Sequence, residues 1–118
     1  MNGNIEKTVD GICEALYNKK AGDIIAIPVG DKTIIAEWFV ICEGNTAPQV
    51  KAISDGLEEK ENELGLELRR KEGYSEGRWI VMDYGDILVH IFHKDERQYY
   101  NMEYLWDTDS KAIAYKGK

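Results

Sequence analysis

The chain has 118 residues, of which 43% are hydrophobic and 31% are charged. This length is typical of one domain with its own hydrophobic core, and the composition argues against a disordered or fibrous protein. No apolar run approaches the roughly 18 residues that a membrane-spanning helix needs. The sequence therefore indicates a single globular domain and excludes a membrane protein.

The charge balance narrows the class of partner. There are 15 Lys and Arg residues against 22 Asp and Glu residues, which gives a formal net charge of −7. Proteins that bind nucleic acid without sequence preference rely on Lys and Arg contacts with phosphates. The acidic balance therefore disfavours generic nucleic-acid binding and favours a basic protein partner.

The cysteines and the N-terminal residues indicate the cellular compartment in which the protein is expected. Cys13 and Cys42 each lie in an apolar stretch and form no C-x-x-C pair, so we expect two buried thiols in a reducing environment. Residues 1–6 lack a basic region followed by an apolar core. We therefore expect neither a secretory signal nor a transit peptide, and a cytoplasmic protein.

The first half of the chain predicts a helix followed by two strands. Apolar residues recur at helical spacing over residues 4–19, which predicts an amphipathic helix. Residues 23–29 predict a short strand. Residues 33–42 (TIIAEWFVIC) are almost continuously apolar, which predicts a strand that is buried on both faces. Helices should then cover both sides of the sheet.

A second helix is predicted over residues 47–64. Asn45 or Thr46 is a suitable N-cap, Pro48 fits the first turn, and Gly65 fits the C-terminal end. The junction at residues 44–46 could also bind an anion, because free backbone N–H groups point outward at a helix start. It lacks the Lys and the several glycines of a phosphate-binding loop, so we favour a capped turn.

The second half predicts three strands, a helix and a tail. The strands are expected over residues 66–71, 78–84 and 87–92, and Gly85-Asp86 is expected to form the turn of a hairpin. The helix is expected over residues 94–106. Residues 107–118 are expected to form a polar, mobile tail. The predicted order is α-β-β-α-β-β-β-α. This order favours an α/β (α+β) domain over residues 1–106, with a mixed five-stranded sheet and helices packed on it.

Two pairs of polar residues could carry chemistry. His90 and His93 form an H-x-x-H pair, but on a strand this spacing places them on opposite faces, so a metal site is disfavoured. Asp83 and Asp86 flank a turn, where they could hold a divalent metal or merely stabilise the turn. No Ser-His-Asp or Cys-His order points to a nucleophile. Catalysis therefore ranks below a structural or partner-facing role.

One long stretch carries a family resemblance. Residues 79–106 read WIVMDYGDILVHIFHKDERQYYNMEYLW, and they resemble the Iojap family, the ribosomal silencing factors. The matching features are the run Asp83-Tyr84-Gly85-Asp86, the strand Val89–His93, Arg97, Tyr100 and the closing Leu105-Trp106. Residues 36–44, 20–24 and 72–74 also match. The resemblance covers about residues 5–106, and its departures at Trp38 and Asn45 fit their structural roles.

The resemblance implies a translation repressor that catalyses no reaction and needs no cofactor. Members of the family bind the large ribosomal subunit through large-subunit ribosomal protein fourteen and sterically block joining of the small subunit. Organelle relatives assist assembly of the large subunit. The family's fold is similar to that of nucleotidyltransferases, but fold similarity does not carry activity. A homodimer of the free protein is also expected, through exposed aromatic residues.

The expected partner-binding residues follow from the matching motifs, and Tyr84 is expected to be exposed at its turn. They are Trp79, Asp83, Tyr84, Gly85, Asp86, His93, Arg97 and Tyr100. His90 is expected to lie in the core or to support the surface from beneath. Three alternatives stay open: a large-subunit assembly factor, a nucleotide-processing enzyme with metal on Asp83 and Asp86, and a metal-binding module that uses His90 and His93.

Overall fold

The structure, a computed structural model, describes residues 2–117, with side chains from residue 5 onward. The elements in chain order are α1 (Asn2–Asn18), β1 (Gly22–Pro28), β2 (Trp38–Gly44), α2 (Ala47–Glu59), α3 (Glu61–Leu64), β3 (Arg70–Glu72), β4 (Trp79–Asp83), β5 (Ile87–His93), α4 (Lys94–Tyr100), α5 (Met102–Trp106) and β6 (Ile113–Ala114). The predicted order of helices and strands is confirmed up to Trp106, with the short helical segments α3 and α5 added, and strand β6 follows in the tail. Within this part of the chain, no helix is long and apolar enough to cross a membrane.

The strands of residues 2–117 form one six-stranded sheet in the order β3-β4-β5-β2-β1-β6. Strands β2 and β5 are parallel, and the other neighbouring strands are antiparallel, so the sheet is mixed as predicted. The expected number of five strands was one too low. The sixth strand, β6, lies in the tail, where Ile113 pairs with Ala26 of β1. Two residues of strand are too few to leave a periodic pattern in the sequence. Mobility of the tail stays a prediction.

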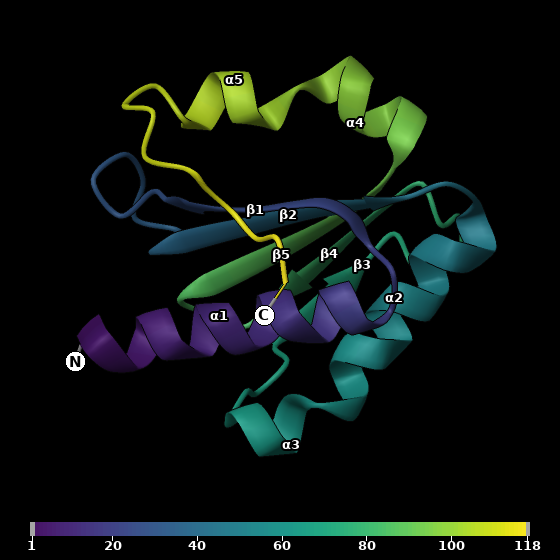
Figure 1. Cartoon of the computed structure of the whole chain (residues 1–118), viewed down its shortest axis with the longest axis horizontal. Helices are drawn as coiled ribbons and strands as arrows, with labels where there is room; N and C mark the ends of the chain where they lie inside the picture. The colour runs from purple at the N-terminus through teal and green to yellow at the C-terminus, as the bar shows by residue number, and fades with distance from the viewer. Residues whose placement is uncertain (1, 118) are drawn as a thin grey trace.

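Helices cover both faces of this sheet (Figure 1). One face packs on α1 and α2, and we call it the α1/α2 face. The other lies under α4 and α5, and we call it the α4/α5 face. The central strands β2 and β5 are buried along most of their length, because neighbouring strands flank them and helices lie above and below. The predicted two-sided burial is therefore confirmed.

The α1/α2 face holds the larger core. Its fully buried side chains come from α1, α2 and three strands, and they include Ile12, Leu16, Val40, Ile53, Leu57, Ile80, Met82 and Ile91. Both cysteines belong to this core, as predicted. Burial raises the pKa of the Cys13 thiol to about 12 and raises that of Cys42 further, so both stay protonated at neutral pH.

The predicted strand over residues 33–42 begins too early. Strand β2 starts at Trp38, and the preceding residues form a loop in which the N–H of Ile35 donates to the Thr33 Oγ1 atom over 3.1 Å. This side-chain bond offers the backbone an alternative to a strand ladder. Ile34 and Ile35 consequently lie in solvent, although β-branched residues favour strands.

Two of the three predicted helices are each divided into two, and the first is continuous as α1. The helix predicted over residues 47–64 breaks at Lys60, and the one predicted over 94–106 breaks at Asn101, which has a φ of 49°. Asn tolerates this left-handed conformation better than most residues, so it can end α4 and begin α5. Gly65 ends α3 as predicted.

Two further local predictions concern the start of α2 and the third strand. Thr46 caps α2, since its Oγ1 accepts the N–H of Gln49 over 3.2 Å, and this is the capped turn that the sequence favours. The strand predicted over residues 66–71 starts later and is shorter, and it covers only Arg70–Glu72. Leu66 and Leu68 instead pack against the core as parts of an irregular segment.

Candidate functional site

The predicted site residues fall into two groups at opposite ends of the β4–β5 hairpin. Trp79 pairs with Phe92 near one end, and Asp83 pairs with Leu88 near the other. Four residue steps along a strand separate the two groups by about 13 Å. The first group holds Trp79, His93, Arg97 and Tyr100, and the second holds Asp83, Tyr84, Gly85 and Asp86. The structure therefore does not bring all eight residues to one site.

The second group, at the turn between β4 and β5, mostly stabilises the turn itself. Tyr84 is only 8% exposed, and its hydroxyl donates to the Glu61 carboxylate over 2.7 Å. Burial is the main cause of a raised pKa of the Tyr84 hydroxyl, and this hydrogen bond raises that pKa further. The expectation that Tyr84 is exposed was wrong, because α3 folds back over the turn residue. Asp83 accepts the N–H of Gly85 over 2.8 Å, and Gly85 has a φ of 91°. Asp86 is exposed.

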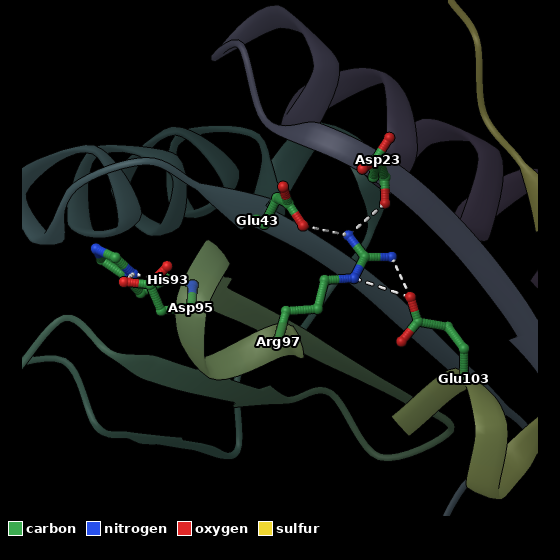
Figure 2. A network of polar contacts seen from close by, with 6 residues as sticks. All are labelled: Asp23, Glu43, His93, Asp95, Arg97 and Glu103. Atoms are coloured by element: carbon green, nitrogen blue, oxygen red, sulfur yellow. Dashed lines mark hydrogen bonds and ion pairs between the residues drawn. The ribbon is translucent and has the colours of Figure 1, made fainter. Parts of the chain in front are cut away.

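Arg97 is buried, although the sequence placed it among the partner contacts. Its guanidinium donates to the Glu103 carboxylate over 2.9 and 2.6 Å, to the Asp23 carbonyl over 2.6 Å and to the Glu43 carboxylate over 3.2 Å. Figure 2 shows these groups converging on the guanidinium from β1, β2 and α5. Arg97 therefore joins α4 to the sheet and to α5, and a planar fork of donors suits several acceptors at once.

His93 lies at the junction of β5 and α4. Its Nδ1 atom accepts the N–H of Asp95 over 3.2 Å, which caps α4. In Figure 2 its side chain lies well apart from the Arg97 network. Neither His93 nor His90 belongs to a group of three or more potential metal ligands among residues 2–117. His93 thus sets the first turn of α4.

An aromatic cluster lies beside α4 on the α4/α5 face. The Trp79 ring stacks on Phe92 with centroids 4.8 Å apart and contacts Tyr100 at 4.7 Å. Tyr99 packs edge-on against Tyr100 at 5.0 Å. Tyr100 is 42% exposed, Tyr99 is 81% exposed, and Trp79 is half-buried. We call Trp79, Tyr99 and Tyr100 the aromatic patch.

His90 supports the aromatic patch from beneath. The indole N–H of Trp79 donates to His90 Nδ1 over 3.2 Å, and His90 is only 6% exposed. Burial lowers the pKa of His90 to about 4, so the imidazole is neutral at pH 7. Since Nδ1 accepts, the proton lies on Nε2, which has no hydrogen-bond partner among the described residues. The predicted core position of His90 is confirmed.

The comparisons with known proteins agree on one family. The model of the family described as "Ribosomal silencing factor during starvation" matches residues 2–117. The chain belongs to this family. The match extends beyond the predicted domain boundary at residue 106 and includes β6. The resemblance to the Iojap family, seen in the motifs of β4 to α5, is confirmed.

Relatives and solved structures support the same membership. The chain is 44% identical over 103 residues to a protein named ribosomal silencing factor RsfS from Halalkalibacterium halodurans, covering 87% of each chain. It is 44% identical over 92 residues to the Bacillus subtilis protein of that name, covering 78% of each. A crystal structure of a Chromobacterium violaceum protein has a TM-score of 0.83 at 31% identity, covering 86% of this chain and 85% of the other.

In this family member, sequence reasoning found the aromatic patch only in part. Trp79 and Tyr100 were among the expected site residues, and His90 was expected to lie in the core or to support the surface from beneath. Tyr99 was missed, and so was the specific contact between Trp79 and His90. On an antiparallel pair, Trp79 and His90 are diagonal neighbours on one face, because Trp79 pairs with Phe92 and His90 with Val81. This contact becomes visible only once the hairpin register is known.

Proposed function

We propose that this protein represses translation by binding the large ribosomal subunit through large-subunit ribosomal protein fourteen. Bound there, it blocks joining of the small subunit by occupying space. Membership in the ribosomal silencing factor family supports this proposal. The family is named for silencing and belongs to no known enzyme class, so we propose a binding protein that acts in the cytoplasm without catalysis.

The observation that carries the proposal is the aromatic patch. Trp and Tyr are the residues most enriched in the energetically dominant centres of protein interfaces. Here Trp79 and Tyr100 are in contact, partly exposed and fixed from beneath by the His90 hydrogen bond. A fixed aromatic pair loses little side-chain entropy on binding. We propose that these two residues contact the partner directly.

The other expected site residues take supporting roles in this proposal. Arg97 holds α4 in place through its hydrogen bonds to Glu103 and to the Asp23 carbonyl. His93 caps the start of α4 by accepting the Asp95 N–H. Together they fix the position of Tyr100 on α4. Asp83 and Gly85 shape the turn, Tyr84 packs it against α3, and Asp86 offers an exposed charge. These are positioning residues rather than contacts, with the exception of Asp86.

Charge favours a protein over bare ribosomal RNA as the docking point. A net charge of −7 repels a phosphate backbone and attracts a basic ribosomal protein. Such attraction raises the association rate and weakens with added salt. We therefore expect binding to the large subunit to weaken moderately as salt is added. We also expect it not to depend on contacts with ribosomal RNA.

The free protein is proposed to form a homodimer through the same patch. Exposed aromatic side chains on one face favour a self-complementary pair. Light scattering during gel filtration should give twice the monomer mass, and Tyr100→Ala should return the mass toward the monomer. A monomer at all concentrations would contradict this part of the proposal and leave ribosome binding unaffected.

Sedimentation with separated ribosomal subunits tests the function. The protein should migrate with the large subunit and not with the small one, and it should reduce the yield of joined ribosomes. Tyr100→Ala should weaken binding by about tenfold or more, whereas Tyr104→Ala should not. Tyr104 is a matched control because it is 78% exposed on α5 and outside the patch.

Three other outcomes would replace the proposal. Binding without inhibition of joining would indicate a role in large-subunit assembly. Failure to bind at low salt would exclude silencing. Stabilisation by a nucleoside triphosphate with Mg²⁺ would then favour the nucleotide-processing enzyme, since a ligand that binds only the folded state raises its stability.

A further inference from the structure

The loop between β1 and β2 exposes two neighbouring isoleucines. Ile34 is 104% exposed, which is as much as an unfolded chain allows, and Ile35 is 66% exposed. Burying an aliphatic side chain of this size is favourable, and neither isoleucine is buried within the fold. Single exposed apolar residues are common on protein surfaces, but two adjacent ones at the end of a loop form a small protruding contact.

Backbone hydrogen bonds hold this loop in one shape. The N–H groups of Lys32 and Thr33 donate to the Val29 carbonyl over 2.8 and 3.1 Å. At the other end, the N–H groups of Glu37 and Trp38 donate to the Asp86 carbonyl over 2.7 and 3.1 Å. The isoleucines are therefore presented on a fixed support, and docking them costs little loop entropy.

An acidic cleft lies at the base of the same loop. Its volume is about 220 Å³, and its charged lining includes Glu6, Asp31, Glu37 and Asp109 against Lys32 and Lys111. Lys32 is already paired with Asp109 over 2.9 Å, so it does not neutralise the remaining carboxylates. The Asp86 carbonyl accepts the Glu37 N–H, so the exposed Asp86 adds a further negative charge to this end of the molecule. This end of the molecule attracts a Lys or Arg side chain.

We propose that the Ile34–Ile35 loop and its acidic cleft form a second docking surface for a basic protein segment of the large ribosomal subunit. An aliphatic recess of that segment would take the two isoleucines, and a Lys or Arg would enter the cleft. The carboxylates disfavour RNA and anionic lipid, because both present phosphates. The inference rests on the proposed function and adds to it a contact distinct from the aromatic patch.

Affinity for isolated large subunits tests the apolar part. The double variant Ile34→Thr, Ile35→Thr should bind about tenfold more weakly than the wild type, with an unchanged melting temperature. Ile113→Thr is the matched control, because Ile113 is 59% exposed on β6 and lies outside the loop. It should bind like the wild type.

Charge reversal and cross-linking test the acidic part and the partner. Glu37→Lys should weaken binding about fivefold, and the exposed Glu67→Lys should not. A photoreactive amino acid at position 34 should cross-link to a basic large-subunit protein, identified by mass spectrometry. A cross-link to ribosomal RNA or to a second copy of this chain would overturn the inference.

The outcomes separate this inference from the proposed function. If the wild type binds large subunits and the isoleucine variant binds equally well, the second surface is excluded and the proposed function stands. If Tyr100→Ala and the isoleucine variant both weaken binding, two contacts are present. If the wild type does not bind at all, the proposed function and this inference fail together.

Discussion

The two faces of the sheet differ in the kinds of side chains that they bury. The α1/α2 face is covered by aliphatic side chains that are almost completely buried. The α4/α5 face contains the buried His90 and Arg97 together with half-exposed aromatic rings. Aliphatic packing stabilises a fold without regard to partners, whereas polar groups held beneath aromatic rings fix the positions of those rings. Both faces contribute apolar burial to stability, and in the proposed function only the α4/α5 face also presents aromatic rings to a partner.

The largest expected effect lies on the α1/α2 face. Leu57→Ala removes a fully buried side chain of α2 and should lower the free energy of unfolding by about 3.5 kcal/mol. Binding per folded molecule should not change. Urea unfolding measures the first effect and subunit sedimentation the second. Leu105→Ala, at a site that is 61% exposed on α5, should change stability by less than about 0.5 kcal/mol.

Arg97→Ala should affect stability and binding together. It leaves the Glu43 and Glu103 carboxylates without their buried cation and should cost about 3 kcal/mol of unfolding free energy. Because α4 loses its attachment to the sheet, affinity for large subunits should fall as well. Arg78→Ala is the control: its 2.6 Å pair with Glu96 is exposed and should contribute less than about 1 kcal/mol. Equal effects of the two variants would contradict the proposed role of Arg97.

The neutral state of His90 predicts a stability that depends on pH. Its pKa is lowered from 6.5 to about 4 by burial, so below pH 6.5 the unfolded chain binds the proton more strongly than the folded one. The contribution is complete above pH 6.5 and is lost as the pH falls toward 4, by up to roughly 3 kcal/mol. His90→Asn, which can still accept from Trp79 but cannot titrate, should show a shallower loss of stability over this range. Identical pH profiles of stability for the wild type and the His90→Asn variant would contradict this role of His90.

The smallest expected effect concerns Tyr84, which packs on the α1/α2 face. Tyr84→Phe removes the hydrogen bond to Glu61 and keeps the ring, so it should cost about 1 kcal/mol of unfolding free energy. Since the hydroxyl faces α3, affinity for large subunits should not change. A marked loss of affinity at unchanged stability would mean that the turn itself contacts the partner, and it would weaken the division between the two faces.

Local sequence signals predicted most of the fold. Helical spacing located α1, the continuous apolar run located the centre of β2, and Gly85-Asp86 located the hairpin. The errors arose where local preference was overruled. Ile34 and Ile35 favour a strand but lie in a loop, because Ile35 bonds to Thr33 and the loop end bonds to Asp86. β6 forms because β1 has a free edge, which the tail sequence cannot reveal.

The candidate site was less predictable than the fold. The motif residues were found, but their exposure was not: Tyr84 and Arg97 are buried, and Tyr99 is the most exposed ring of the patch. Exposure depends on what packs above a residue. For Tyr84 that is α3, and for Arg97 it is the convergence of Asp23, Glu43 and Glu103 from distant positions in the chain.

The sequence by itself determined the family, the order of helices and strands up to Trp106, the two-sided burial of the sheet and the acidic charge. These follow from periodicity, composition and motif, which are properties of neighbouring residues. Only the tertiary structure decided that His90 supports Trp79, that Arg97 is an internal attachment and that Ile34 and Ile35 protrude beside a cleft of carboxylates. The reason is physical: burial, hydrogen-bond partners and the local field are set by residues that are distant in sequence and adjacent only after folding.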